Sequence, residues 1–209
     1  GITQSNGMEF GLSYINSGVS NKIIGFVRYV LPNSDAASKN IKRGDVFYAV
    51  NDVELTVDNY RELLFSDSST YTLSFASVSD GSIAPNGVSI SLTKEVDFQE
   101  NPIHVHKVLS IGGKKIGYLL YNGFTEAYDN ELTGVFMDFK TQAVDELVLD
   151  FRYNPGGRVK SAVHLASLAT GQFSGSVFAK KKYNSKINDD NLNYYFNNES
   201  VQLNMNKVY

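Results

Sequence analysis

Short runs rich in β-branched and aromatic residues, each bounded by Gly, Asn, Asp or Ser, follow one another through the first part of the chain. Runs of this kind are typical of β-strands. Short helices are expected at Asp35–Lys39 and Val57–Phe65, and a polar hairpin loop at Ser79–Asn86. The inventory predicts a small, mostly antiparallel β-barrel with two helices. Its strands are expected at Glu9–Ile15, Ile23–Val30, Asp45–Asn51, Tyr71–Val78 and Val88–Thr93.

The rhythm of the chain changes after Pro102. Ile103–Ile111 and Lys114–Tyr121 predict a hairpin around Gly112-Gly113. Further on, Glu146–Arg152 contains a continuous apolar run, which is typical of a strand buried on both faces.

Apolar residues recur at helical spacing before and after this buried strand. The order strand–helix–strand–helix predicts an α/β layer with a parallel pair of strands. The second helix is expected to end at Gly171. The apolar positions are Tyr128, Leu132, Val135, Phe136 and Phe139 in the first helix, and Val159, Ala162, Val163, Ala166 and Ala169 in the second.

Two domains are expected, at residues 1–97 and 98–209, because the pattern changes across Asp97–Pro102. Near the end, Ser174–Lys181 predicts a strand and Val201–Tyr209 the start of another. Between them Tyr183–Asn198 is rich in Asn, Asp and Tyr and has little periodicity, so we expect an excursion that carries surface arms. The fold class is therefore α+β in the first part and α/β in the second.

Composition removes several classes of function. The net charge is −3 and the pI about 5.6, which argues against binding to a nucleic-acid backbone. The chain has no cysteine, which excludes disulfides, thiolate nucleophiles and cysteine-based zinc sites. Its apolar stretches fall short of the ~18 residues that a membrane span needs. Neither the compartment nor the oligomeric state follows from composition.

Glu9-Phe10-Gly11-Leu12 opens the first strand with a glycine between two apolar residues. Successive backbone N–H groups at such a turn can form a nest for an anion such as a terminal carboxylate. Gly11 lets the backbone of a ligand approach without a Cβ in the way. The alternative interpretation is a strand that happens to contain a glycine.

The motifs that follow this turn resemble a PDZ domain of the bacterial, permuted type, over residues 8 to 95. Asn40 and Asp52 stand where that family usually has glycine, and both residue types tolerate positive φ. The motifs are Leu31-Pro32-Asn33-Ser34-Asp35-Ala36-Ala37, Ile41-Lys42-Arg43-Gly44-Asp45-Val46 and Ala49-Val50-Asn51-Asp52.

The PDZ resemblance implies a binding site for protein or peptide chains that have a free C-terminus. The peptide would add as a strand beside residues 11–15, with its carboxylate at Phe10, Gly11 and Leu12. The helix Val57–Phe65 would form a wall of the groove.

The segment Asp150-Phe151-Arg152-Tyr153-Asn154-Pro155-Gly156-Gly157 leads from the buried strand to the second helix. Free N–H groups and the positive end of the helix dipole meet at such a point, which can bind phosphate or stabilise an oxyanion. Neither a phosphate loop nor a dinucleotide-binding fingerprint follows the glycines. A Pro-Gly-Gly connection without chemistry is the other interpretation.

Together with Lys115–Tyr121, Asn122-Gly123-Phe124 and the helix before Leu147, this segment resembles the C-terminal processing (tail-specific) peptidases. These are serine proteases with a PDZ module before a crotonase-like α/β catalytic domain. The resemblance implies that Gly156 or Gly157 contributes an N–H to the oxyanion hole. It also implies that Asp150, Arg152 and Asn154 hold the turn in shape.

That family's serine nucleophile lies in a Ser-x-Ala-Ser-Ala-like segment after a strand resembling Leu203–Tyr209, and its lysine base lies further on. Neither matches a position of this sequence, so we expect this polypeptide alone to be inactive. The second domain is thus expected to be the first half of a catalytic domain. The family implies a bacterial cell-envelope location, in the periplasm or as an outer-membrane lipoprotein, and requires no cofactor.

Candidate residues for a metal site or for another catalytic dyad are weaker. His104 and His106 alternate on one strand and could form a metal pair, but no third ligand follows at motif spacing, so no metal is expected. His164 is interpreted as a helix-surface residue, and Lys160 with Ser161 would make a poor dyad because neighbours on a helix point in different directions. The alternative function is a non-catalytic PDZ protein that binds peptides on a degenerate crotonase-like scaffold.

Overall fold

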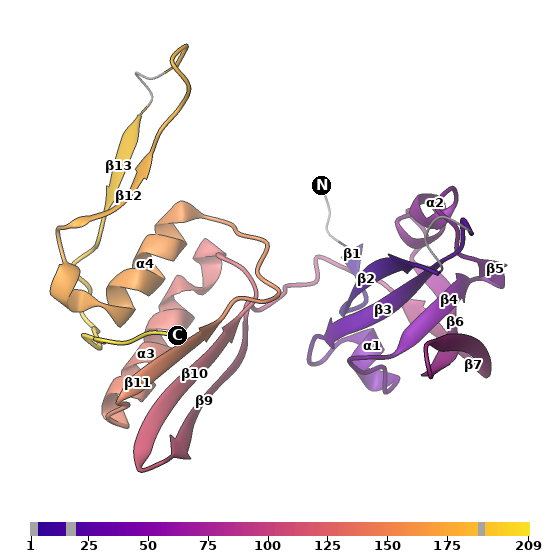
Figure 1. Ribbon diagram of the computed structural model, residues 1–209, viewed down its shortest axis with the longest axis horizontal. Helices are drawn as coiled ribbons and strands as arrows, with labels where there is room; N and C mark the ends of the chain where they lie inside the picture. The colour runs from indigo at the N-terminus through magenta and orange to yellow at the C-terminus, as the bar shows by residue number, and fades with distance from the viewer. Residues whose placement is uncertain (1–3, 16–19, 188–190) are drawn as a thin grey trace. The chain divides into compact units, whose positions relative to one another are not determined.

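The computed structural model describes residues 4–15, 20–187 and 191–209. Its internal contacts group into two compact units, residues 1–100 and 101–209, which are treated separately below. Both units are mixed α+β structures that contain several sheets (Figure 1). Of the helices in the described ranges, none is long and apolar enough to cross a membrane.

The first unit is built on a six-stranded antiparallel sheet. Its order is β2-β3-β4-β6-β7, with β5 paired to β4, so β2 and β7 are the two edges. Since no pairing between β2 and β7 appears in the described chain, the sheet is open and the expected closed barrel is wrong. The strands are β2 Met8–Tyr14, β3 Ile23–Val30, β4 Val46–Val50, β5 Val53–Glu54, β6 Thr70–Ser79 and β7 Ser82–Thr93.

A small ladder and two short helices complete this unit. Strands β1 (Gln4–Ser5) and β8 (Glu95–Val96) pair with each other, and the helices are α1 (Asp35–Ser38) and α2 (Tyr60–Leu64). Asn40 and Asp52 have φ values of 59° and 63°, so the turns that usually need glycine are kept.

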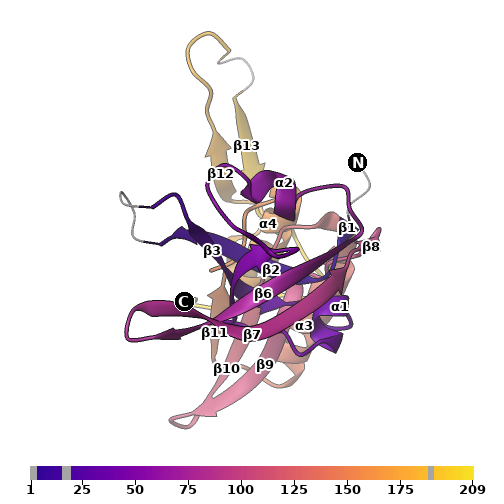
Figure 2. The same cartoon turned by 90° about the vertical axis from the view of Figure 1, so that its right-hand side faces the viewer.

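The polar loop expected at 79–86 is mostly strand. Val78 pairs with Ile83 and Ser77 with Ala84, and Figure 2 shows β6 and β7 as one long hairpin. Only Asp80 and Gly81 form the turn, with φ values of 51° and 77°. An Asp-Gly pair with both residues at positive φ is the favoured two-residue hairpin turn. Pro85 is accommodated because β7 is an edge strand.

The second unit has a three-stranded sheet and two helices. Strand β10 (Lys114–Tyr121) lies between β9 (Ile103–Ile111), which is antiparallel to it, and β11 (Glu146–Asp150), which is parallel. Both the hairpin and the parallel pair are therefore confirmed. Helices α3 (Asp129–Thr141) and α4 (Val159–Ala169) cover one face of the sheet (Figure 1). One turn of 3₁₀ helix, Glu126–Tyr128, leads into α3.

The apolar face predicted for α3 is buried, but the face predicted for α4 is only partly correct. Val159 is 43% exposed, whereas Leu165 and Leu168 are buried. The cause is a second cover on α4: Leu203 N–H donates to Leu168 O at 2.8 Å, and Met205 N–H to Ala169 O at 2.9 Å. A helix packed on two sides buries residues all round rather than one stripe.

The end of the chain forms an arm and an extension of the sheet. Helix α4 ends at Ala169 and Gly171 starts a 3₁₀ turn, Gly171–Phe173. The arm is a two-stranded antiparallel hairpin of β12 (Val177–Lys181) and β13 (Leu192–Tyr195), which projects from α4 in Figure 1. Within the expected strand Val201–Tyr209, only Val208 bridges to the sheet, in parallel with Leu147.

Candidate functional site

The turn between β11 and α4 is joined to the segment that follows β10 by two backbone hydrogen bonds. Phe124 N–H donates to Gly156 O at 2.9 Å, and Arg158 N–H donates to Phe124 O at 2.8 Å. These bonds form a parallel bridge between Phe124 and Gly157. The partner of the glycine turn is therefore a backbone segment more than thirty positions earlier in the chain.

The two glycines of the turn are required for different reasons. Both have positive φ, +113° at Gly156 and +139° at Gly157, a region that other residues rarely adopt. A Cβ on Gly157 would lie 2.3 Å from Phe124 O, whereas a Cβ on Gly156 would meet nothing within 4 Å. Gly157 is thus fixed by a close backbone approach as well as by its dihedral angle.

The side chain of Asn154 fixes the turn from inside. Its Nδ2 donates to Tyr121 O at 3.0 Å, and its Oδ1 accepts from Gly156 N–H at 2.8 Å. The Gly156 N–H is therefore already used. In the part of the chain that the structure describes, Gly157 N–H has no hydrogen-bond partner.

The unbonded amide of Gly157 continues into the N-terminus of α4. Arg158, the N-cap residue, makes no side-chain cap, and the N–H groups of Val159, Lys160 and Ser161 find no acceptor in the described ranges. The first N–H groups of a helix and its dipole create a partial positive charge. An anion, or an oxygen on which negative charge develops, is stabilised at such a point.

Asp150 anchors the beginning of the turn. Its carboxylate accepts from Arg152 Nε at 2.9 and 3.0 Å, from an Arg152 terminal nitrogen at 2.6 Å, and from Tyr118 Oη at 2.8 Å. The bonds from Arg152, opposed in part by desolvation of the carboxyl group, lower the pKa of Asp150 to about 2. Burial and the neighbouring Asp150 raise the pKa of Tyr118.

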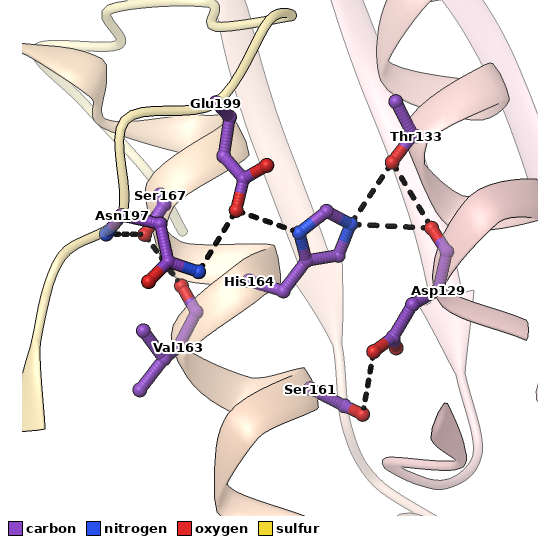
Figure 3. Close-up of polar contacts among 8 residues, drawn as sticks. All are labelled: Asp129, Thr133, Ser161, Val163, His164, Ser167, Asn197 and Glu199. Atoms are coloured by element: carbon purple, nitrogen blue, oxygen red, sulfur yellow. Dashed lines mark hydrogen bonds and ion pairs between the residues drawn. The ribbon is translucent and has the colours of Figure 1, made fainter. Parts of the chain in front are cut away.

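A polar network ties α4 to α3 and to the segment after the arm (Figure 3). His164 Nδ1 lies 2.8 Å from Glu199 Oε1, and its Nε2 lies 2.9 Å from Thr133 Oγ1 and 3.1 Å from Asp129 O. The side chain of His164 is only 15% exposed, so its assignment to the helix surface is wrong. Glu199, in the irregular segment after the arm, contacts it. A segment of this kind leaves no periodic pattern in the sequence from which the burial could be predicted.

Ser161 belongs to the same network. It is fully buried, and its hydroxyl donates to Asp129 Oδ2 at 3.0 Å. Nearby, burial and the Asp129 carboxylate raise the pKa of Tyr121 to about 12. Ser161 is thus a buried connection between α4 and α3, and it offers no accessible hydroxyl for nucleophilic chemistry.

His104 and His106 lie on β9, as expected from their spacing. No group of three or more His, Cys, Asp or Glu side chains that could hold a metal ion occurs in residues 4–15, 20–187 and 191–209.

In the first unit, Phe10, Gly11 and Leu12 lie on the edge strand β2. Ile15 N–H donates to Lys22 O, and Tyr14 pairs with Ile23, so hydrogen-bonded pairs alternate along the ladder from this end. Gly11 opposite Phe26 is therefore a hydrogen-bonded pair. Its N–H faces β3, while the N–H groups of Phe10 and Leu12 face the open edge.

Two cavities follow this edge, with α2 and its flanking residues on their other side. The larger, about 490 Å³, is lined by Phe10, Leu64 and Phe65, by the cation Lys94, and by the carboxyl groups of Glu9 and Asp67. The smaller, about 260 Å³, is lined by Leu12, Ser13, Tyr14, Ile23, Val57 and Tyr60. The rings of Phe10 and Phe65 are 5.9 Å apart. An extended chain would find unpaired strand backbone, apolar side chains and charged groups of both signs along this groove.

Comparison with known proteins shows that the second unit resembles one peptidase family. Residues 115–206 match the model of peptidase family S41. Over 142 residues the chain is 25% identical to a carboxyl-terminal-processing protease of Picosynechococcus sp., an alignment that covers 66% of this chain and 33% of that protein. The resemblance to the C-terminal processing peptidases is therefore confirmed.

Solved structures agree with this result. A crystal structure from Bacteroides fragilis assigned to the S41 proteases has a TM-score of 0.73 and 29% identity, covering 99% of this chain and 56% of that chain. The photosystem II D1 C-terminal processing protease shares the fold, with a TM-score of 0.52, 21% identity and coverage of 79% and 44%. The chain thus spans about half the length of these structures and a third of the curated relative. The resemblance supports a protease function.

We expect Gly157→Ala to destabilise the second unit more than Gly156→Ala does. Strain at positive φ costs about 1–3 kcal/mol in both variants, but only the Cβ on Gly157 collides with Phe124 O. Urea unfolding of the two variants and the wild type measures the difference. Equal losses would show that the close approach at Phe124 does not constrain the turn.

Asp150→Asn should change the acid sensitivity of the second unit. Asp150 has a pKa of about 2 in the folded chain, below the ~3.9 of an unfolded aspartate. Its contribution is therefore complete above the unfolded value and is lost as the pH falls from about 4 to about 2. The variant should be less stable at pH 7 and lose less stability over that window, measured by urea unfolding against pH. Asp138→Asn, an exposed carboxylate on α3, is the control, and identical slopes for Asp150→Asn and the wild type would contradict the anchoring role.

Proposed function

We propose that the chain is part of a serine-type endopeptidase of the C-terminal processing kind, in which Gly157 supplies an N–H to the oxyanion hole. The observation that carries this proposal is the unbonded Gly157 amide next to an uncapped helix N-terminus, while Asn154 occupies the Gly156 amide. The resemblance to peptidase family S41 agrees with it.

In the proposed reaction a serine attacks the scissile carbonyl carbon and a lysine accepts its proton. Negative charge then develops on the carbonyl oxygen, where the Gly157 N–H would donate. Removal of one such donor typically costs about 2.7–4 kcal/mol of transition-state stabilisation. Phe124 N–H, bonded to Gly156 O, holds the peptide plane that carries the Gly157 N–H, and Asn154 holds the Pro155–Gly156 plane before it, so Asn154 acts as a positioning residue.

The serine and the lysine are not assigned to any residue of this sequence. Ser161 is buried against Asp129, and its neighbour Lys160 is exposed. The 209-residue polypeptide by itself is therefore proposed to be inactive.

The groove between β2 and α2 is proposed to bind the free C-terminus of the substrate, as a PDZ domain does. The peptide would add as a strand to the open edge of β2. Phe10 and Leu12 would exchange backbone hydrogen bonds with it. Gly11, whose N–H faces β3, is needed because a Cβ there would lie 2.4 Å from the Phe26 ring. On the family resemblance, the protein is proposed to work in the bacterial cell envelope.

Decapeptides that end in Ala, Val or Phe should bind the chain about tenfold or more tightly as free acids than as carboxamides. The expected ratio follows from a charge-assisted hydrogen bond to the carboxylate. Fluorescein-labelled peptides and anisotropy titrations measure it. Leu12→Pro removes an N–H that faces the open edge and should abolish binding. A second edge-strand variant, Ser89→Pro on β7, is the matched control and should leave peptide binding unchanged. Equal affinity for acid and amide would remove the carboxylate site.

The polypeptide should not hydrolyse an unfolded protein such as reduced, carboxymethylated lactalbumin, as followed by mass spectrometry. The serine and the lysine of the proposed reaction are not assigned to any of its residues. Hydrolysis that disappears in Gly157→Ala, while Gly156→Ala retains part of it, would instead place a nucleophile within these 209 residues.

A further inference from the structure

Another cavity, of about 370 Å³, lies in the second unit between the first half of α4 and the arm. Lys160 and Val163 line it from α4, and Asn193, Tyr194, Tyr195 and Asn197 line it from β13 and the residues after it. Lys160 follows Gly157 by three positions and lies in the first turn of α4. The cavity is therefore lined by the first turn of the helix that follows the proposed oxyanion donor.

The wall that the arm contributes is fastened to α4. Asn197 N–H donates to Ser167 Oγ at 2.8 Å, and Asn197 Nδ2 donates to Glu199 Oε1 at 2.9 Å, the same oxygen that faces His164 (Figure 3). At the base of the arm, Phe196 packs against Phe173 and Phe178, with ring centroids 5.8 and 5.3 Å apart. A cavity held by these contacts exists before a ligand arrives.

The lining carries a positive charge and several hydrogen-bond donors. Lys160 is the one charged residue in it, and its ammonium makes no ion pair with any residue that the structure describes. Glu199, a carboxylate of the segment after the arm, is engaged by His164 and Asn197. The amide groups of two asparagines and the hydroxyls of two tyrosines are suited to a carboxylate, because ammonium, amide and hydroxyl all donate hydrogen bonds to it.

We propose that this cavity is a subsite for an acidic side chain, Asp or Glu, of the polypeptide that binds at the Gly157 turn. This inference rests on the proposed peptidase function and assigns that site a substrate preference. The carboxylate of a peptide terminus has the same chemistry, so the test separates the two sources.

The test uses the ¹⁵N-labelled 209-residue chain and three peptides. Two are blocked at both ends, acetyl-Ala₃-Glu-Ala₃-amide and its Gln counterpart, and the third is the Gln peptide with a free C-terminus. The Glu peptide should shift the amide signals of Lys160, Tyr194 and Asn197, with an affinity about fivefold higher than that of the blocked Gln peptide, as for an exposed ion pair. Added salt should reduce this ratio.

Lys160→Met should remove the preference for Glu, whereas Lys140→Met, an exposed lysine on α3, should preserve it. Equal affinities of the blocked peptides, or a preference that survives in Lys160→Met, would overturn the proposal. So would equal binding here of the Gln peptide with a free C-terminus, since the terminus would then be the ligand. Failure of the proposed function is read separately, because binding of free C-termini in the β2–α2 groove shifts signals of the first unit.

Discussion

The pairing of Phe124 with the glycine turn is the constraint on which the candidate site depends. Phe124 uses both its N–H and its C=O on this turn, which brings the backbone at Gly157 too close for any Cβ. Both glycines must then adopt positive φ, and the peptide planes turn one after the other. The Gly156 N–H then bonds to Asn154 Oδ1 inside the turn, whereas the Gly157 N–H has no acceptor in the part of the chain that the structure describes.

The two neighbouring residues also differ in exposure: Gly156 is half-buried and its N–H has a protein acceptor, whereas Gly157 is exposed, so water can serve its N–H. The fold satisfies Gly156 through Asn154 and Tyr121 O, and it braces the start of the turn through Asp150, Arg152 and Tyr118. Gly157 N–H is thus held in place by bonds that its neighbours make. A donor fixed in this way needs no reorganisation when charge develops nearby, which is where electrostatic catalysis gains over water.

The sequence predicted the parts of this arrangement that are local. A buried strand, two glycines and a helix are visible in Glu146–Ala169, and the parallel pairing of β10 and β11 follows from the order of elements. The bond partner Phe124 is distant in sequence and acts through its backbone, so its side chain gives no signal. Gly156 and Gly157 could not be distinguished either, because their difference lies in a side-chain bond from Asn154.

The two wrong predictions, for His164 and for the loop at 79–86, also have physical causes. His164 was misinterpreted because the cover over it, residues 197–199, belongs to an irregular segment, and burial by such a segment leaves no periodic pattern in the helix. The loop expected at 79–86 failed for the opposite reason. Asp80-Gly81 is a strong local hairpin signal, but Ser82, Pro85 and Asn86 interrupt the strand pattern that follows it, as such residues can on an edge strand.

Helix α4 connects the glycine turn to α3 and to the segment that follows the arm. Its first turn carries the unbonded amides, and its side chains reach α3 through Ser161 and His164. Ser167 and Leu168 bind the segment that follows the arm. Because close-packed elements shift as units rather than bending residue by residue, the helix cannot move the turn without moving the arm wall. In the proposed enzyme, a cavity beside Lys160 in the first turn of α4 and a donor at Gly157, in the hydrogen-bonded turn that leads into α4, would hold a substrate side chain and its carbonyl at a fixed separation. This is the condition under which side-chain binding contributes to orientation at the reacting bond.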